Sequence, residues 1–414
     1  MPPAAPNHDD AAALHQQLVA RLQQAGYLAS PGLLAAFQAV PRHYFLPERP
    51  LREVYQDRAI AVKRSQGIPI SSSSQPTMMA IALTQLEVQP GQRVLEIGAG
   101  TGYNAALLGE LVGDQGRVVA VDYDGGLAAT ARDRLQGLGY RQVQIEQADG
   151  FYGYAPGAPY DRILLSTAAW DLAPAWRQQL RPQGRLVLPL VLAGSTQIAI
   201  ALQPEAEGWR SSTAIPCSFM PLRGTAPALA PPRSVALAPG LTLWTRHAPP
   251  VTGEQLRTWL ANPGPVIPTG QWLRAAELDY SLRFWLVLQD PYFGEVLAER
   301  PLMTLPAALR PWVQRALTGR SLFTVDATGG AALVLEPPSG SDSEGELAIA
   351  SFGAGAARVA SWQQQLQAWE QRGRPAPRGL RLRAYPQPCD RQPGPGETVI
   401  DKPWSRLLLT HAQF

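Results

Sequence analysis

Apolar residues at helical spacing mark the first part of the chain. Between Asp9 and Val40, leucines and a phenylalanine recur three or four positions apart, and Ser30 and Pro31 interrupt the pattern. This predicts two helices that separate at that point. The same spacing returns over residues 77–86, just before a proline and a glycine, and predicts another helix. Between these helices, the polar run SQGIPISSSSQP is rich in serine and proline, and we predict a loop there.

Short apolar runs then alternate with glycine turns and helical patterns. The pattern places strands at 93–97, 118–121, 143–147, 162–166 and 185–190, and helices at 104–111 and 126–138. Nearly continuous apolar strands that alternate with helices are typical of a parallel sheet covered on both faces. We therefore predict an α/β fold with a doubly wound, Rossmann-like sheet, in which a ligand binds at the carboxyl ends of the strands.

The composition of the sequence changes after Gly224. The stretch APALAPPRSVALAPG is low in complexity and offers little reason to pack. Because 414 residues exceed what one compact core usually supports, we predict a first domain over 1–225, a linker over 226–250 and an accessory α+β domain over 251–414.

Composition narrows the classes of partner. The formal charge is only +3 and no basic block is interleaved with aromatic residues, so nucleic acid is not indicated. Cys217 and Cys389 are the two cysteines and lack CxxC spacing, which argues against a metal site and against a disulfide framework. The first ten residues carry acid where a signal peptide carries base, and no apolar run approaches the roughly 18 residues of a membrane span. We expect a cytoplasmic protein without a membrane partner.

The segment VLEIGAGTGYN carries the chemistry, since it follows a predicted strand and opens a predicted helix. Its glycines Gly98, Gly100 and Gly102 alternate, whereas a dinucleotide fingerprint reads GxGxxG. Glu96 stands at the end of the strand, where a negative charge repels a phosphate. A sulfonium cofactor with an amino group has no phosphate and is positively charged, so the acid favours that class of cofactor. A tight strand-to-helix turn without any ligand is the alternative.

Two further acids end the next strands. Asp122, which ends VVAVD, is placed to accept hydrogen bonds from both ribose hydroxyls, although a helix cap is the alternative role. Asp149, in EQADG, is placed to accept one from the adenine amino group. Three acids on successive strand ends predict an S-adenosylmethionine site. The neighbouring residues of these motifs complete it: Ala99, Tyr103, Asn104, Tyr123 and Gly150.

The segments around this site resemble the protein-L-isoaspartate O-methyltransferase family. Upstream lie PRHYFLP, YQDRAI and the serine run that leads into TMMA; downstream lie APYDRILLSTAA and QLRPQGRLVLPL. The resemblance covers about 41–224. It implies that Ser74 lies near the transferred methyl group, that Ser72 and Ser73 are catalytic neighbours, and that Gln75 contacts the cofactor. Ser72 stands where the family has threonine, and Ser73 where it has an apolar residue.

The resemblance also implies the reaction. A carboxylate of Asp or isoaspartate in a peptide or protein attacks the sulfonium methyl group, and the methyl ester closes to a succinimide (aspartimide). A carboxylate is already ionised at neutral pH, so no general base is required. His43, beside Tyr44 and Phe45, is interpreted as a packed or capping residue.

Several functions remain open at this stage. Family members that tailor ribosomally made, cross-linked peptides (lanthipeptides and graspetides) carry extensions, and the long second half favours that role, with housekeeping repair of isoaspartyl residues as the alternative. A non-catalytic peptide-binding scaffold and a nicotinamide oxidoreductase are the other hypotheses. The three acids weigh against the scaffold, and the glycine spacing weighs against the oxidoreductase.

Overall fold

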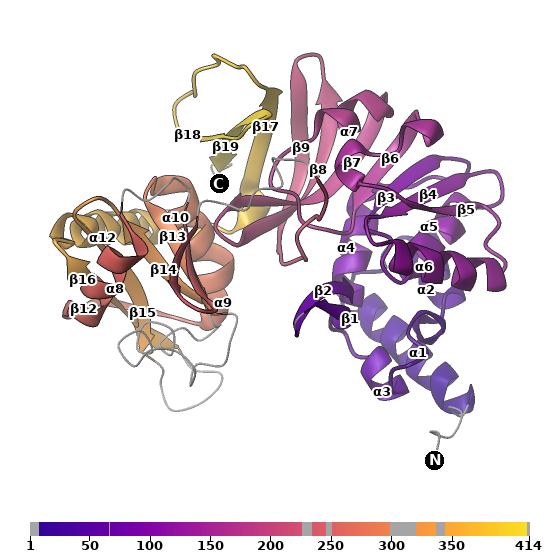
Figure 1. The fold of residues 1–414 in the computed structure, drawn as a ribbon, viewed down its shortest axis with the longest axis horizontal. Helices are drawn as coiled ribbons and strands as arrows, with labels where there is room; N and C mark the ends of the chain where they lie inside the picture. The colour runs from indigo at the N-terminus through magenta and orange to yellow at the C-terminus, as the bar shows by residue number, and fades with distance from the viewer. Residues whose placement is uncertain are drawn as a thin grey trace.

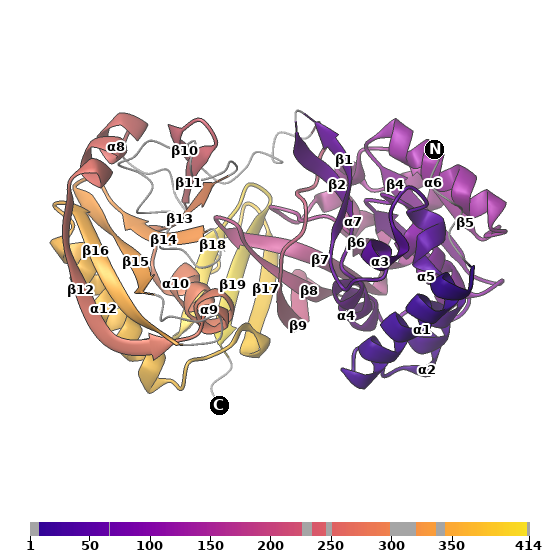
Figure 2. The ribbon, with the colours of Figure 1, turned by 90° about the horizontal axis from the view of Figure 1, so that it is seen from below.

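The computed structural model describes residues 8–65, 67–225, 234–245, 251–298, 320–336 and 344–411. Figures 1 and 2 show a first unit, which carries the N-terminus, and a second unit built on another sheet, with strands β17–β19 between them. We call residues 8–225 together with 380–411 the first unit, and residues 234–371 the second unit.

The two predicted N-terminal helices are confirmed. They are α1 (His8–Gln24) and α2 (Pro31–Ala39), and the Ser30 side chain caps α2 by accepting a hydrogen bond from the Leu33 nitrogen at 3.1 Å. Their apolar faces pack, with α4, α5 and α6, on one face of the first sheet. The predicted helix over 77–86 is α4 (Pro76–Leu86).

The first sheet contains the five predicted parallel strands in the order β5-β4-β3-β6-β7. Alternate residues of these strands enter two different apolar cores, one on each face, which confirms the α/β, doubly wound fold. The strands and the helices that connect them are β3 (Arg93–Ile97), α5 (Tyr103–Val112), β4 (Arg117–Asp122), α6 (Gly125–Gly137), β5 (Val143–Gln147), β6 (Tyr160–Leu165), α7 (Pro174–Gln179) and β7 (Leu180–Ala193).

The prediction of a loop through the serine run is wrong for most of its length. Strands β1 (Ile60–Ser65) and β2 (Ile68–Ser73) form an antiparallel hairpin, in which Ser72 pairs with Ala61 and Ser73 with Ile60. Serine has little strand preference of its own, but pairing with β1 satisfies the backbone of β2. Ser74 and Gln75 follow the strand and lead into α4.

The first sheet continues beyond the parallel strands. After β7 come β8 (Thr196–Glu205) and β9 (Gly208–Cys217), both antiparallel. Strand β17 (Leu380–Pro386) then pairs with β9, and β19 (Ser405–His411) and β18 (Glu397–Asp401) follow it. The end of the chain therefore returns to the first sheet, whereas the sequence predicts that residues 251–414 form one separate domain. A pairing across some 170 residues leaves no local pattern from which this return could be predicted.

The second unit is a seven-stranded sheet in the order β10-β11-β13-β14-β15-β16-β12. Strands β10 and β11 lie inside the stretch predicted as a linker, whose residues 226–233 and 246–250 lie outside the described residues. The elements are β10 (Ser234–Ala238), β11 (Leu241–Thr245), α8 (Gly253–Ala261), β12 (Pro263–Leu273), α9 (Ala275–Glu277), the π-helix η5 (Leu278–Leu282), α10 (Arg283–Gln289), β13 (Phe293–Ala298), β14 (Arg320–Val325), β15 (Gly329–Glu336), β16 (Gly345–Gly353) and α12 (Ala356–Gln371).

A buried carboxylate joins the two units. Glu295 of β13 is fully buried and accepts hydrogen bonds from the Ser195 nitrogen at 2.7 Å and the Thr196 hydroxyl at 2.8 Å, in the turn between β7 and β8. The Arg283 guanidinium, also buried, lies 3.8 Å from the same carboxylate. Glu295 therefore links the second unit to the β7–β8 turn of the first unit, and both units contribute side chains to a common apolar core.

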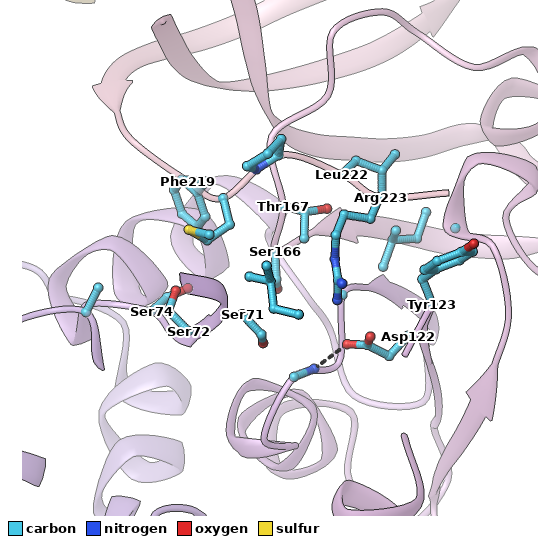
Figure 3. A pocket seen from close by; sticks show the side chains of 18 of the residues that line it. Ser71, Ser72, Ser74, Asp122, Tyr123, Ser166, Thr167, Phe219, Leu222 and Arg223 are labelled. Carbon is cyan, nitrogen blue, oxygen red and sulfur yellow. Dashed lines mark hydrogen bonds between the residues drawn. The ribbon is translucent and has the colours of Figure 1, made fainter. Parts of the chain in front are cut away.

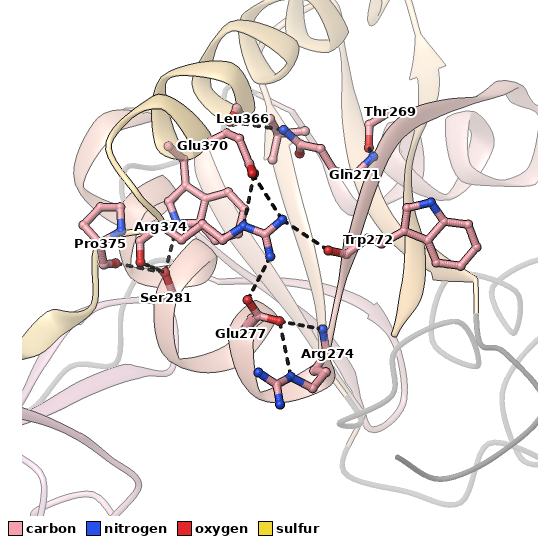
Figure 4. A network of polar contacts seen from close by, with 11 residues as sticks. Thr269, Gln271, Trp272, Arg274, Glu277, Ser281, Leu366, Glu370, Arg374 and Pro375 are labelled. Atoms are coloured by element: carbon pink, nitrogen blue, oxygen red, sulfur yellow. Dashed lines mark hydrogen bonds and ion pairs between the residues drawn. The ribbon is translucent and has the colours of Figure 1, made fainter. Parts of the chain in front are cut away.

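An arginine organises the turn that sends the chain back to the first sheet. Arg374, just after α12, donates to Glu277 at 2.8 Å, to Glu370 at 3.1 Å and to the Trp272 carbonyl at 3.3 Å (Figure 4). It therefore ties α12, α9 and β12 together at the point where the direction of the chain reverses. Within the described residues, no helix is long and apolar enough to cross a membrane.

Candidate functional site

A cavity of about 220 Å³ opens where β3, β4 and β6 end (Figure 3). From β3 the chain order of the strands runs outward on both sides, to β4 and β5 on one side and to β6 and β7 on the other. Ligands bind at such switch points in α/β sheets. The β2–α4 segment and the segment after β9 form the other walls. The lining residues are Ala59, Ile70, Ser71, Ser72, Ser74, Gln75, Met78, Ile97, Gly98, Gly100, Val121, Asp122, Tyr123, Gly150, Ser166, Thr167, Ser218, Phe219, Met220, Pro221, Leu222 and Arg223.

The glycine turn forms the floor of the cavity. Gly98, Gly100 and Gly102 all have positive φ angles, of 97°, 53° and 86°, which other residues rarely adopt. A Cβ on Gly98 would lie 2.8 Å from the Thr167 side chain, and one on Gly102 would lie 3.2 Å from Leu135 of α6. Gly98 thus lets the wall after β6 approach the turn, while Gly102 serves helix packing and does not line the cavity.

Asp122 is the acidic residue on the cavity wall. Its carboxylate accepts hydrogen bonds from the backbone nitrogens of Gly100 and Asp124, each at 2.9 Å. Burial raises its pKa, and these hydrogen bonds and the nearby Arg223 oppose that effect. Each carboxylate oxygen keeps one lone pair, which matches two ribose hydroxyls. Because the Gly100 nitrogen is already bonded to an anion, the turn is a poor site for pyrophosphate.

Glu96 lies beneath the cavity and does not line it. It is fully buried, and its Oε1 accepts hydrogen bonds from the Asn104 amide at 2.8 Å and the Ser166 hydroxyl at 2.7 Å, while Oε2 has no partner. Burial raises the pKa of Glu96 to about 7, and the two hydrogen bonds oppose the shift. Its link to the cavity is therefore Ser166, which lines it.

Asp149 also lies outside the lining, although Gly150 next to it belongs to the wall. One carboxylate oxygen accepts from the Phe151 nitrogen at 3.0 Å, and the other accepts from the nitrogen and hydroxyl of Thr225. We call residues 218–225 the strap. Two hydrogen bonds with Ala168, one from the Leu222 nitrogen at 2.8 Å and one to the Met220 carbonyl at 2.7 Å, hold the strap over the cavity.

The serine segment faces the glycine turn from the opposite side (Figure 3). Ser72, Ser74 and Gln75 line the cavity, as does Ser71. The side chain of Ser73 is buried instead, where its hydroxyl accepts a hydrogen bond from Arg42 at 3.2 Å. Strand alternation alone does not account for this, because Ser71, two residues earlier in β2, lines the cavity. The hydrogen bond with the buried Arg42 holds the Ser73 side chain away from it.

The structure thus brings together part of the predicted site. Residues predicted for the site that line the cavity are Ser72, Ser74, Gln75, Gly98, Gly100, Asp122, Tyr123 and Gly150; those that do not are Ser73, Glu96, Ala99, Gly102, Tyr103, Asn104 and Asp149. The sequence reasoning missed Ser71, Ser166, Thr167 and the strap. Ser166 and Thr167 follow β6, so the strand-end rule applied to the Asp122 and Asp149 positions points to them as well.

Comparisons with known proteins show which family the chain is similar to. The sequence model described as Protein-L-isoaspartate(D-aspartate) O-methyltransferase (PCMT) matches residues 13–226, more than half of the chain. The Protein-L-isoaspartate O-methyltransferase of Methanopyrus kandleri is 39% identical over 210 residues, which are 50% of this chain and 91% of that protein. The one of Ignicoccus hospitalis is 34% identical over 207 residues, 50% of this chain and 96% of that protein.

A solved structure is similar over most of the chain. It bears the name protein-L-isoaspartate O-methyltransferase, covers 89% of this chain and 96% of its own, and has a TM-score of 0.50 at 23% identity, which speaks for the fold alone. The family match confirms the predicted resemblance, and this structure agrees with it in fold. The chain belongs to the protein-L-isoaspartate(D-aspartate) O-methyltransferase family and is a methyltransferase that depends on S-adenosylmethionine.

Proposed function

We propose that the chain methylates an aspartyl or isoaspartyl carboxylate of a peptide or protein at the cavity between the glycine turn and the serine segment. The observation that carries the proposal is that Asp122, on the glycine side, faces Ser72 and Ser74 across one cavity. One side has the groups for a nucleoside, and the other has hydroxyls for a carboxylate.

The residues of the turn fit S-adenosylmethionine. We assign the ribose to Asp122, which retains acceptor capacity on both oxygens, and the adenine to the wall formed by Gly150, with Asp149 behind it. We assign Glu96 an indirect role in cofactor binding, because it is buried and contacts the cavity through the hydroxyl of Ser166. Its unpartnered Oε2 is a buried acceptor in need of a donor. When bound, the cofactor supplies an electrophilic methyl group on a sulfonium.

The protein's part in the reaction is positioning. Hydroxyls such as Ser74 orient the carboxylate, which is ionised at neutral pH and needs no base. Holding the reacting groups in line can supply on the order of 7 to 11 kcal/mol. The apolar side chains of Phe219, Met220 and Leu222 cover the cavity and limit access of water. His43 contacts the Tyr55 hydroxyl and is not among the lining residues.

Two substrate roles fit this site. The names of the relatives favour isoaspartyl residues of proteins, the repair role. Tailoring of a ribosomally made peptide, ending in an aspartimide, is the second candidate, and Ser72 and Ser73 favour it because they depart from the family pattern. The long second half does not distinguish the two roles, since a structure named as an isoaspartyl methyltransferase covers most of it.

The returning strands support an accessory role for the second half. Lys402, in the turn between β18 and β19, donates to the carbonyls of Trp170 and Val191, and the Trp404 nitrogen donates to Asp171 at 2.7 Å. These contacts fix the loop that follows Ser166 and Thr167. We therefore propose that the C-terminal part shapes the substrate side of the cavity. The predicted cytoplasmic location and lack of nucleic-acid partners stay predictions.

Mass spectrometry tests the proposal directly. The protein is incubated with S-adenosylmethionine and an isoaspartyl peptide, with the matched aspartyl peptide as control. Gain of one methyl group, followed by loss of methanol as the succinimide forms, is expected for the isoaspartyl peptide. Activity restricted to a constrained, cross-linked peptide selects tailoring, and calorimetry that detects NAD but no S-adenosylhomocysteine contradicts the proposal.

A further inference from the structure

A cationic side chain lines the cavity opposite its acidic residue. Among the residues that line it, Arg223 is the cationic side chain and Asp122 the acidic one. Figure 3 shows the Arg223 side chain extending into the cavity toward Asp122. Its charge opposes the upward shift that burial gives the pKa of Asp122, and it adds to the lowering that Lys63 causes in the pKa of Asp124, so the guanidinium lies within electrostatic reach of both. The strap therefore delivers a positive charge to a place where a negatively charged substrate has to arrive.

The backbone on both sides of Arg223 is fixed. Leu222 on one side donates its nitrogen to the Ala168 carbonyl at 2.8 Å. Thr225 on the other side donates its nitrogen to Asp149 at 2.7 Å. The side chain itself is only half buried, so it can turn between Asp122 and a ligand while the backbone stays in place.

A substrate carboxylate meets an electrostatic difficulty in this cavity. It would lie beside the Asp122 carboxylate, which lines the cavity, with the carboxyl group of Glu96 buried beneath Ser166. Two like charges in a partly buried site repel each other by an amount that low dielectric enlarges. The planar guanidinium of arginine offers a fork of donors that matches a carboxylate and removes the repulsion.

On this basis we propose that Arg223 binds the substrate carboxylate and makes the site specific for an anionic group over a neutral amide or ester. The inference rests on the proposed function and names the residue that selects its substrate class. When the nucleoside hydroxyls occupy the acceptors of Asp122, the guanidinium turns to the carboxylate oxygen that does not attack.

The chemistry determines which kinetic constant this contact affects. An electron pair of the carboxylate oxygen forms the new O–CH3 bond, the electrons of the broken C–S bond remain on sulfur, and no proton moves. Negative charge on the carboxylate falls as the ester forms. The contact with Arg223 is therefore strongest before the transition state, and such an interaction supports binding more than turnover.

Steady-state kinetics with an isoaspartyl peptide test the assignment in Arg223→Gln and Arg223→Lys. In Arg223→Gln, KM for the peptide should rise by about tenfold or more while kcat stays within about threefold. Affinity for S-adenosylhomocysteine should change by less than about twofold, and Arg223→Lys should recover part of the KM effect. Arg64→Gln is the matched control, because Arg64 is exposed on the nearby hairpin, donates to the Gly67 carbonyl and is not a lining residue.

A neutral analogue provides a second measurement. A peptide whose isoaspartyl carboxylate is replaced by an amide should inhibit the wild type more weakly than the carboxylate peptide binds. In Arg223→Gln that difference should disappear. Equal discrimination in both proteins, or an unchanged KM in an active variant, would overturn the assignment. A large loss of S-adenosylhomocysteine affinity would instead place Arg223 on the cofactor, whereas an inactive wild type that still binds S-adenosylhomocysteine contradicts the proposed function itself.

Discussion

The carboxylate of Asp149 is bonded to Thr225, 76 residues further along the chain, through the Thr225 nitrogen at 2.7 Å and its hydroxyl at 3.0 Å. Gly224 packs against the same carboxylate, where a Cβ would lie 2.3 Å from one oxygen. The strap therefore uses acceptor capacity that the adenine amino group needs in the proposed site. If the proposed adenine site is right, we expect binding of the cofactor and the position of the strap to be coupled through this pair.

Replacing Thr225 with Val tests that coupling. The variant removes the hydroxyl donor and keeps the shape, so one lone pair of Asp149 becomes available. We expect S-adenosylhomocysteine to bind more tightly by about 1 kcal/mol, or about fivefold, as measured by calorimetry. Weaker binding would show that Thr225 holds Asp149 in the orientation that the ligand requires.

Asp122→Ala tests the ribose assignment. Loss of two hydrogen bonds should weaken S-adenosylhomocysteine binding by about 1 to 3 kcal/mol. Asp124→Ala is the control: Asp124 caps α6, accepts from the Gly126 and Leu127 nitrogens and pairs with Lys63 at 2.6 Å. That variant should lose stability, about 0.5 to 2 kcal/mol for the cap, with near-normal affinity. Equal affinities in the two variants would remove Asp122 from the binding site.

Ser74→Ala addresses the methyl-transfer side of the cavity. Because the Ser74 hydroxyl is assigned to orient the substrate carboxylate, kcat for the isoaspartyl peptide should fall by about tenfold or more while cofactor affinity is kept. Ser73→Ala is the comparison, since its hydroxyl is bonded to the buried Arg42. It should affect stability first. An equal fall in turnover and cofactor affinity for Ser74→Ala would make Ser74 a cofactor contact.

The junction of the two units gives a prediction on stability. Glu295→Ala leaves the buried Arg283 without its carboxylate, and removing one partner of such a pair typically costs about 3 to 5 kcal/mol. Glu205→Ala breaks an exposed pair with Arg210 at 2.9 Å and should cost less than about 1 kcal/mol. Urea unfolding followed by tryptophan fluorescence compares them. Similar midpoints would mean that the units do not depend on the buried contact.

The parallel strands can be predicted from the sequence because their signals are local. The bounds of β3 and β5 coincide with the predicted ones, since β3 is a short, largely apolar run and β5 alternates apolar and polar residues, each between turn residues. The hairpin of β1 and β2 was missed because its stability comes from pairing, not from the preferences of Ser71 and its neighbours. The return of β17 to β9 was missed for the same reason, on a much longer scale.

The site shows a similar division. Asp122 can be predicted because it ends a parallel strand, and ligands bind at the carboxyl ends of such strands. The burial of Glu96 and the turn of Ser73 away from the cavity depend on side-chain neighbours such as Asn104 and Arg42, which no motif spacing gives. Arg223 belongs to a segment without a periodic pattern. Its position above the glycine turn depends on tertiary structure and cannot be predicted from the local sequence.

Glu96 provides a prediction on pH dependence. Its pKa is raised from 4.5 to about 7 in the folded protein. Between these values the folded protein holds a proton that the unfolded chain has lost, so this group makes stability fall as the pH rises from about 4.5 to 7 and has no further effect above. The loss amounts to about 3 kcal/mol.

Glu96→Gln removes the titrating group and keeps an oxygen for Asn104 and Ser166. The free energy of unfolding of the variant, measured with urea from pH 4.5 to 8, should therefore gain about 3 kcal/mol relative to wild type over that range. Parallel curves for the two proteins would mean that the Glu96 carboxylate remains ionised when folded. A buried negative charge would then lie directly beneath Ser166, and the role of Glu96 would change from holding that hydroxyl to attracting the positive charge of the cofactor.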